Sequence, residues 1–440
     1  MKNKNLEKKK VFSFDKTYSS IISFAQPDKY KSLENISKDH RKIINAGSNL
    51  SYSPLGFCED GISIDLKKFN RIIELDKENK IITVEAGITL IEFLNFTLKH
   101  ELWIPQLPGY PSITIGGAVA SNSHGKSCGL HGAIRKSIKS ILLFHKNHGL
   151  IKLSENENKD IFDLTIGGLG LTGSIINVTL NLIEIKSTRF ITKIKKVNSI
   201  EECQKIISKK GDSYIYSWHR ADTIKKFGEG FIFENSIDVN NKGQFQKLIE
   251  NNYSLRPFLF PLWNRYSIKL INKIYQYVNS NKKSIEIEDF LSVIFPFYGK
   301  EKYFNFFGQK GFLESQLLID EIYLQDFINQ FKTLLKIYKP IITLLSLKNM
   351  SGEHKFLRFE GNKVCLTFDY IKSRSSIKFM HEIDRLCIKY KIIPSIIKDS
   401  RLNKETFNKT YIYADEFKEK LYEFDKKRTY QSEVSNRLGL

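Results

Sequence analysis

Two segments rich in glycine and other small residues constrain this chain more than any other feature. The first reads AGSNLSY (46–52) and the second reads IGGAVASNSHG (115–125). Backbone amides that small residues leave exposed can form a concave nest for a pyrophosphate without the help of a helix dipole. Either segment alone is also typical of a tight turn. Together, with strand and helix patterns between them, they favour a site for a pyrophosphate-containing ligand.

The sequence around these segments predicts short strands and a few helices, and its pattern of secondary structure changes along the chain. Runs such as GISIDL and IITVEAG read as strands, and ILLFHK and GLIKL flank an Asn-His-Gly turn typical of a hairpin. Thr89 and Glu92 form a capping-box pattern that opens the amphipathic run LIEFLNFTLKHE. After about Ser187 glycines become less frequent and helical runs such as QDFINQFKTLLKIY appear. Near Lys391 the pattern of short strands and turns returns. We therefore expect a division into 1–186, 187–390 and 391–440.

Gly168, Gly170 and Gly173 form a GxGxxG motif, which on its own suggests a Rossmann dinucleotide site. Such a site needs a strand before the motif and a helix after it, so that the pyrophosphate meets the helix N-terminus. Here the helical run DIFDLTIGG precedes the motif and the β-branched run SIINVTLNL follows it. Because this order is reversed, we expect no nicotinamide-type site at this position.

The size, charge and cysteine content of the chain limit which classes of protein it can belong to. At 440 residues the chain exceeds what one hydrophobic core usually supports. Its 69 basic and 48 acidic residues would suit nucleic acid, an anionic membrane or a phosphorylated substrate, but the lysines are scattered and compositional bias accounts for much of the excess. No nucleic-acid motif, signal peptide or membrane span is visible. The five cysteines are far apart and include no CxxC pair, so we expect no metal site and a cytoplasmic protein.

Four segments taken in order resemble a known family. GSNLSY, VEAG, PGYPSITIGGAVASNSHGKSCGLHG and GGLGLTGSI are similar to the PCMH-type FAD-binding domain of the vanillyl-alcohol-oxidase superfamily. The SHGK stretch and the ending SIIKDSRLNKETF…SNRLGL most resemble the decaprenylphosphoryl-β-D-ribose 2′-oxidase family. In the middle of the chain the resemblance is weaker and rests on FGQKGFLESQ, SLKNM and KVCLTF. The resemblance implies an α+β fold with a two-subdomain FAD-binding domain over 1–186. It also implies an inserted α+β substrate (cap) domain over 187–390, with the C-terminal segment 391–440 closing the FAD domain.

The same resemblance assigns the cofactor residues. Asn49 stands where the family usually has glycine, and asparagine tolerates the left-handed backbone of such a turn. In several relatives a histidine of the first loop carries the flavin covalently, but 41–99 contains none, so we expect non-covalent FAD unless His124 or His131 substitutes. The implied FAD-binding residues are Gly47, Ser48, Asn49, Leu50, Ser51, Tyr52, Gly116, Gly117, Ala118, Ser121, Asn122, His124, Gly125, Gly129, Gly170, Gly173, Ile175 and Lys398.

Three residues are implied to act in catalysis, namely His124, Lys126 and Lys398. His124 and Lys126 occupy the family's His-Gly-Lys position beside the flavin, where a histidine suits the removal of a hydroxyl proton during hydride transfer. Lys398, within KDSR, matches a lysine at the pyrimidine end of the flavin, where a fixed cation stabilises the anionic reduced form.

The resemblance places Gln316, Lys348 and Cys365 in the substrate pocket. Gln316 would form hydrogen bonds, Lys348 would hold a phosphate or sugar oxygen, and Cys365 would pack the pocket wall. Glu314 lies two positions before Gln316 and therefore on the same strand face, where it replaces a neutral amide of the family. We expect this replacement to alter the substrate or the charge around it.

The implied activity is FAD-dependent oxidation of a secondary hydroxyl of a sugar to a keto sugar, with a polyprenyl-phosphate-linked or otherwise activated pentose as substrate. In the family a partner short-chain reductase restores the hydroxyl with inverted configuration, which serves cell-surface polysaccharide synthesis. The segment RPFLFPLWNR (256–265) suits peripheral contact with the inner face of an anionic membrane, or a mobile lid. Two alternatives remain: a sugar-lactone or polyol oxidase acting on a free sugar, and a non-enzymatic basic protein that binds membranes or nucleic acid.

Overall fold

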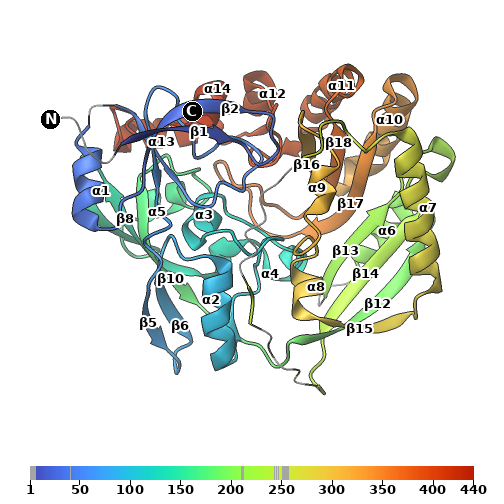
Figure 1. Ribbon diagram of the computed structural model, residues 1–440, viewed down its shortest axis with the longest axis horizontal. Helices are drawn as coiled ribbons and strands as arrows, with labels where there is room; N and C mark the ends of the chain where they lie inside the picture. Colours follow the sequence, from blue (N-terminus) through green and yellow to red (C-terminus); the bar gives the residue numbers. More distant parts are fainter. Residues whose placement is uncertain are drawn as a thin grey trace.

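The computed structural model describes residues 6–39, 41–209, 213–241, 243, 245, 247–249 and 257–440. It is a mixed α/β structure with several sheets (Figure 1). In the view of Figure 1 the sheets of the N-terminal part lie on the left and those of the middle of the chain lie on the right. The last helices, drawn in red, return across the top toward the N-terminal strands.

Two sheets form the N-terminal part of the described chain. In the first, β2 pairs antiparallel with β1 and parallel with β4, and β4 also pairs parallel with β3. The second is antiparallel throughout, in the order β5-β6-β10-β8-β9, and β7 pairs with β11 in a separate short ribbon. The strand bounds are β1 (Glu7–Phe12), β2 (Ser19–Ala25), β3 (Ile43–Ala46), β4 (Ile62–Asp65), β5 (Ile72–Asp76), β6 (Ile81–Glu85), β7 (Leu102–Trp103), β8 (Ile138–His145), β9 (Gly149–Ser154), β10 (Ser174–Asn181) and β11 (Ile183–Glu184).

Two further antiparallel sheets follow, in the orders β13-β14-β12-β15 and β17-β18-β16-β19. Their edges meet where the Ser217 hydroxyl donates to the Leu347 carbonyl (3.0 Å) and accepts from the Leu347 amide (2.9 Å). The two sheets share one apolar core with helices α6, α10 and α11. The strand bounds are β12 (Arg189–Val197), β13 (Tyr214–His219), β14 (Gly230–Ile237), β15 (Ile285–Asp289), β16 (Phe312–Ile319), β17 (Ile342–Met350), β18 (Lys363–Ile371) and β19 (Ile393–Pro394).

Several helices begin where a side chain caps the first turn. Thr89 and Glu92 form the predicted capping box at the start of α2, and Asp320 and Ser373 cap α10 and α11. No helix within the described ranges is both long and apolar enough to cross a membrane. The helix bounds are α1 (Tyr30–Ser37), α2 (Leu90–Thr97), α3 (Ile115–Ala120), α4 (Cys128–His131), α5 (Lys159–Thr165), α6 (Ile200–Ile207), α7 (Arg265–Asn281), α8 (Phe290–Ile294), α9 (Lys302–Asn305), α10 (Glu321–Tyr338), α11 (Arg374–Tyr390), α12 (Lys404–Thr410), α13 (Ala414–Phe424) and α14 (Glu433–Leu438).

One segment expected to be an open glycine nest is a helix. Residues Ile115–Ala120 form α3, and the Thr114 hydroxyl caps it by accepting from the Gly117 amide (3.2 Å). Glycine disfavours helix, but here the lack of side chains allows close packing, since a β-carbon on Gly116 would lie 2.7 Å from the β-carbon of Ala86. The prediction of a nest without a helix was therefore wrong for 115–120, because tertiary packing outweighs local propensity.

The C-terminal segment returns to the N-terminal sheets. The Ile43 amide donates to the Thr429 carbonyl (3.0 Å), and Ile43 forms a parallel bridge with Tyr430. Buried side chains of α12, α13 and α14 share an apolar core with Ile44. The Ser53 amide donates to the Ile397 carbonyl (3.1 Å), so the first glycine loop and the segment that carries Lys398 lie side by side.

Candidate active site

A cavity of about 1000 Å³ runs between the N-terminal part and the two middle sheets. Both glycine segments, the segment around 169–175 and the C-terminal stretch 395–398 form one end of it. The faces of the two middle sheets and helix α7 form the rest. The predicted site residues in its wall are Gly47, Ser48, Asn49, Leu50, Ser51, Tyr52, Gly116, Gly117, Ser121, His124, Gly125, Lys126, Gly170, Gly173, Ile175, Gln316, Lys348 and Lys398.

Of the remaining predicted site residues, Gly129 is exposed and does not line the cavity, while Ala118, Asn122 and Cys365 lie behind this wall. Ala118 is fully buried in the core beneath α3. The Asn122 amide nitrogen donates to Glu360 Oε2 (2.8 Å), which turns its side chain away from the cavity. Cys365 is buried, with Sγ 3.8 Å from Thr367 Oγ1. Contact of these residues with a ligand would require a shift of the wall, and their geometry suits support of the lining instead.

The first glycine loop has the backbone that its sequence predicts. Asn49 adopts a left-handed conformation with φ of 53°, which asparagine tolerates better than most residues. The Ser48 hydroxyl donates to the Ser112 carbonyl (2.5 Å) and ties this loop to the approach of α3. Gly47 has no room for a side chain, because a β-carbon there would lie 2.2 Å from Thr114 Oγ1. The two glycine segments therefore pack directly on each other.

The GxGxxG segment joins the same end of the cavity in the reversed order that its sequence predicts. Helix α5 precedes it and strand β10 follows it. The Asn45 amide nitrogen donates to the Gly173 carbonyl (3.2 Å), and the Ser174 hydroxyl donates to Asn45 Oδ1 (2.8 Å). These hydrogen bonds hold the GxGxxG segment beside the first glycine loop. The segment therefore forms part of the cavity wall and does not present a Rossmann-type helix N-terminus.

A charged, hydrogen-bonded group of side chains lies in the polar part of the cavity. Lys398 Nζ lies 3.7 Å from the centroid of the Tyr52 ring and 3.4 Å from Glu314 Oε1. The Gln316 amide nitrogen donates to the same Glu314 oxygen (2.9 Å), since both side chains project from one face of β16. Burial raises the pKa of Tyr52 well above its usual range, and the charge of Glu314 raises it further, so Tyr52 stays protonated.

His124 lies nearby, with its ring stacked on Phe359 at a centroid distance of 5.7 Å. Burial lowers the pKa of His124 well below its usual value, and the charges of Lys348 and Lys398 lower it further. The imidazole is therefore neutral at physiological pH and can accept a hydrogen bond. Its low basicity makes it a weak proton acceptor, in contrast to the role expected from the sequence.

Lys126 is held by the protein itself. Its Nζ donates to the Val293 carbonyl and lies 3.9 Å from the centroid of the Tyr216 ring. Burial lowers the pKa of Lys126 well below its usual value, and the charges of Lys348 and Lys300 lower it further. An anion placed among these three lysines would offset both effects, so this part of the cavity suits a phosphate group.

The far arm of the cavity, called the apolar arm below, is lined by aromatic and aliphatic side chains together with Asn272 and Asn279, and it was not identified from the sequence. Tyr216 and Trp218 alternate along β13, and Ile274 and Val278 project from one face of α7. Ile274 and Val278 are 52% and 47% exposed, so this arm opens at the molecular surface. Alternation in YIYSWH predicts a shared face for the aromatic residues, but it cannot distinguish a cavity wall from an ordinary core.

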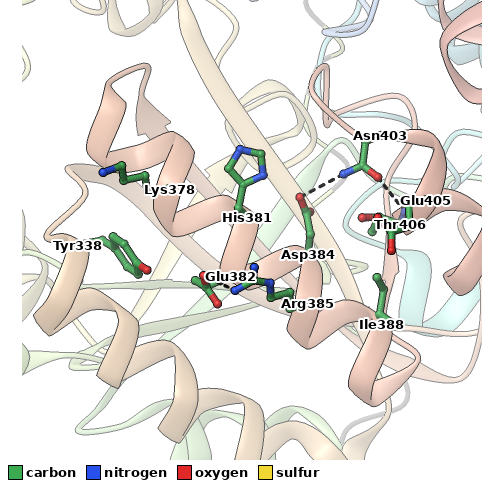
Figure 2. Close-up of a pocket in the computed structure, with 10 residues that line it drawn as sticks. All are labelled: Tyr338, Lys378, His381, Glu382, Asp384, Arg385, Ile388, Asn403, Glu405 and Thr406. Atoms are coloured by element: carbon green, nitrogen blue, oxygen red, sulfur yellow. Dashed lines mark hydrogen bonds and ion pairs between the residues drawn. The ribbon is translucent and has the colours of Figure 1, made fainter.

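A second hollow lies on the outer surface between α11 and α12 and is drawn in Figure 2. Several of its charged side chains have protein partners: Arg385 donates to Glu382 (2.7 Å), and Asp384 accepts from Arg401 (2.7 Å). Among the residues that Figure 2 labels, Asn403 also points toward Asp384. The bonds from Arg401 and Asn403 tie the start of α12 and the segment before it to α11.

The large cavity, in contrast, fits FAD. Its volume is at the upper end of the range for ligand sites and leaves space for cofactor and substrate together. Glycines line one end, where side chains would push apart the closely packed segments that form this wall. Ser123 Oγ is buried in this wall without a partner among the described residues, and buried polar atoms normally have one, so a bound ligand is suited to supply it.

Comparisons with known proteins agree with this geometry. Residues 27–154 match the FAD binding domain family. The decaprenylphosphoryl-β-D-ribose oxidase of Mycolicibacterium smegmatis is 25% identical, in an alignment that covers 96% of this chain and 95% of that protein. The L-gulonolactone oxidase of Mus musculus is 31% identical over 36% of this chain and 37% of its own length. The mitochondrial L-galactono-1,4-lactone dehydrogenase of Arabidopsis thaliana is 27% identical over 40% of this chain and 30% of its own length.

Proposed function

Because this chain is an FAD-dependent oxidoreductase acting on CH–OH groups, we propose that it oxidises a secondary hydroxyl of a polyprenyl-phosphate-linked pentose, or a similarly activated sugar, to a keto group. One observation carries the proposal: the cavity joins a lysine-lined polar part to an apolar arm that opens at the surface. The relative that aligns with 96% of this chain is named for a substrate with the same two chemical parts.

The residues divide between cofactor and substrate. The glycine segments hold FAD without a covalent bond, and His124 is the one histidine among the described lining residues. When bound, FAD takes up the hydride of the carbinol carbon. Lys398 supplies positive charge beside it, while Lys126 and Lys348 bind the phosphate. Gln316 and the neutral His124 orient the sugar through hydrogen bonds.

The proposal includes the division of the chain expected from its sequence. Residues 1–186 form the FAD-binding domain, in two subdomains built on the first two sheets. Residues 187–390 form the substrate domain, with the apolar arm between its sheet β13-β14-β12-β15 and helix α7. Residues 391–440 return to close the FAD site and bring Lys398 to it. The positions of these elements around the cavity support this division.

We also propose peripheral contact with the inner face of a membrane, where a lipid-linked sugar resides. Phe260, Tyr266 and Tyr277 are 78%, 85% and 74% exposed, on α7 and the segment just before it. Lysines on α7 would favour an anionic surface. Arg256, which the sequence included in this patch, lies outside the described residues. A partner short-chain reductase would then reduce the keto sugar with inverted configuration, and the pair would serve cell-surface polysaccharide synthesis.

A lactone or polyol oxidase acting on a free sugar is the second candidate. The lactone-oxidising relatives support it, although they align with little more than a third of this chain. A free sugar also leaves the apolar arm without a function. A non-enzymatic binding protein does not agree with the FAD-dependent activity of the relatives.

The test is to mix the FAD-loaded protein anaerobically with a polyprenyl-phosphate-linked pentose or with L-gulono-1,4-lactone and to follow the flavin absorbance. Bleaching by the lipid-linked pentose alone supports the proposal. Bleaching by the lactone alone favours the second candidate, and the absence of a yellow cofactor after reconstitution would exclude both.

A further inference from the structure

Two acidic side chains face each other at the polar part of the cavity. In the antiparallel pair of β16 and β18, Glu314 is directly opposite Asp369, and Gln316 is opposite Thr367. Side chains directly opposite in such a pair share one face, with β-carbons about 4.5–5.5 Å apart. Glu314 is 5% exposed and Asp369 is 1% exposed. Two like charges at this distance and depth repel strongly, so one of the two carboxyl groups must hold a proton.

The hydrogen-bond partners show which group is ionised. Glu314 Oε1 accepts from Gln316 (2.9 Å) and lies 3.4 Å from Lys398 Nζ, an arrangement that stabilises a carboxylate. Asp369 Oδ2 accepts from the Tyr303 hydroxyl (2.8 Å), while Asp369 Oδ1 has no donor in the described structure. Burial raises the pKa of Asp369 well above its usual range, and the charge of Glu314 raises it further. Asp369 therefore keeps the proton, which its free oxygen can donate to Glu314.

The two carboxyl groups differ in access to the cavity. Glu314 is part of its wall, together with Gln316 and Lys398, whereas Asp369 lies behind it. The tyrosines around Glu314 add no second negative charge at neutral pH, because Tyr52 and Tyr303 have raised pKa values and stay protonated. The titratable groups around the pair are Tyr52, Lys398, Tyr303, Lys348, Cys365 and, through Gln316, His124.

We propose that Glu314 is the proton acceptor of the reaction and that Asp369 positions it through a shared proton. This proposal rests on the proposed function. As the substrate is oxidised, its C–H bond breaks and the hydride, with both electrons, passes to FAD. Its O–H bond breaks as well, the proton moves to the Glu314 carboxylate, and the electron pair left on oxygen forms the C=O bond. The positive charge of Lys398 lies beside the Glu314 carboxylate and keeps it in place.

The shared proton is tested without substrate, by infrared spectroscopy of the FAD-loaded wild type, Glu314→Gln and Asp369→Asn. We expect a carboxylic-acid C=O band that shifts in D2O, is lost in Asp369→Asn and moves in Glu314→Gln, because Asp369 holds the proton and donates it to Glu314. Glu419→Gln, an exposed position on α13, is the matched control and keeps the band. A wild-type band that survives in both variants overturns the shared proton.

The catalytic role is tested by stopped-flow reduction of the flavin with a polyprenyl-phosphate-linked pentose across a range of pH. We expect Glu314→Gln to bind FAD normally but to be reduced about 100-fold more slowly and with a different pH dependence from the wild type. Wild-type rates and pH dependence in this variant overturn the role of Glu314. If this sugar fails to reduce even the wild-type flavin, both the proposed function and the catalytic role of Glu314 are wrong. The infrared band still tests separately whether Glu314 and Asp369 share a proton.

Discussion

Gly47 packs so closely on Thr114 that a β-carbon at residue 47 would lie 2.2 Å from the threonine hydroxyl oxygen. Because that hydroxyl also caps α3, Gly47→Ala must displace one of the two glycine segments proposed to hold the cofactor. We expect the variant to lose bound FAD, measured as visible flavin absorbance after reconstitution. Gly129→Ala is the matched control, since a β-carbon there meets Asn349 at an ordinary 3.5 Å. Equal FAD loading of the two variants would contradict the packing argument.

Asn49 tests the left-handed turn of the first loop. With φ of 53°, glycine is accommodated there without strain, whereas a β-branched side chain is not. We expect Asn49→Gly to retain FAD and Asn49→Val to lower the free energy of unfolding by about 1–2 kcal/mol. Urea unfolding of the FAD-free proteins measures this difference. An Asn49→Val protein as stable as Asn49→Gly would show that the turn adopts another backbone.

Local patterns in the sequence were sufficient for much of the FAD side of the cavity. The capping box at Thr89 and Glu92, the hairpin of β8 and β9, and the order of α5 and β10 around the GxGxxG motif all depend on neighbouring residues. The contacts of Gly47 and Gly116 do not, because they join segments far apart in the chain. For the same reason α3 was predicted as a loop: its glycines disfavour a helix, whereas the Thr114 cap and packing against Ala86 and the core stabilise one.

The substrate side depends on register and distant pairing. Spacing placed Glu314 and Gln316 on one face of a strand, but Asp369 could not be assigned to Glu314 without the pairing of β16 with β18. The apolar arm requires β13 and α7 to meet, and the sequence of α7 alone reads as an ordinary amphipathic helix. In the structure its apolar face is exposed and polar Asn272 points inward to Asp222 (2.7 Å).

Lys398 is expected to matter for reduction of the flavin and not for the fold. Its Nζ contacts Tyr52 and Glu314 at the cavity wall, so Lys398→Ala removes the positive charge beside the proposed proton acceptor and in the proposed cofactor site. We expect FAD to remain bound and its reduction by substrate to slow by roughly 100-fold or more. Lys409→Ala, an exposed position on α12, is the control. Unchanged reduction by the Lys398 variant would remove this residue from the mechanism.

Asp163 links α5 to the loop before β18 and makes stability depend on acid pH. Burial alone would raise the pKa of Asp163, but hydrogen bonds from Lys355 (2.8 Å) and Arg358 (2.9 Å) outweigh burial and hold this pKa at about 2. Because the pKa is lowered on folding, the carboxylate stabilises the protein above about pH 4 and loses this effect as the pH falls toward 2.

We therefore expect Asp163→Asn to lower the free energy of unfolding by about 2 kcal/mol at pH 7 and by clearly less at pH 3. Urea unfolding at the two pH values measures both. Asp160→Asn, an exposed position on the same helix, should have little effect at either pH. A loss of stability in Asp163→Asn that is the same at both pH values would show that the ion pairs are not its cause.

The exposed apolar residues before α7 test the membrane contact. Phe260 is 78% exposed, and burying a phenylalanine side chain is worth roughly 1.5–3 kcal/mol. We expect Phe260→Ser to weaken binding to vesicles of phosphatidylcholine and phosphatidylglycerol about tenfold or more, measured by sedimentation, with FAD loading unchanged. Leu150→Ser is the control, because Leu150 is 61% exposed but lies on β9, away from the cavity mouth. If both variants sediment with the vesicles as the wild type does, the membrane does not bind at this surface and the lipid-linked sugar must enter the apolar arm from solution.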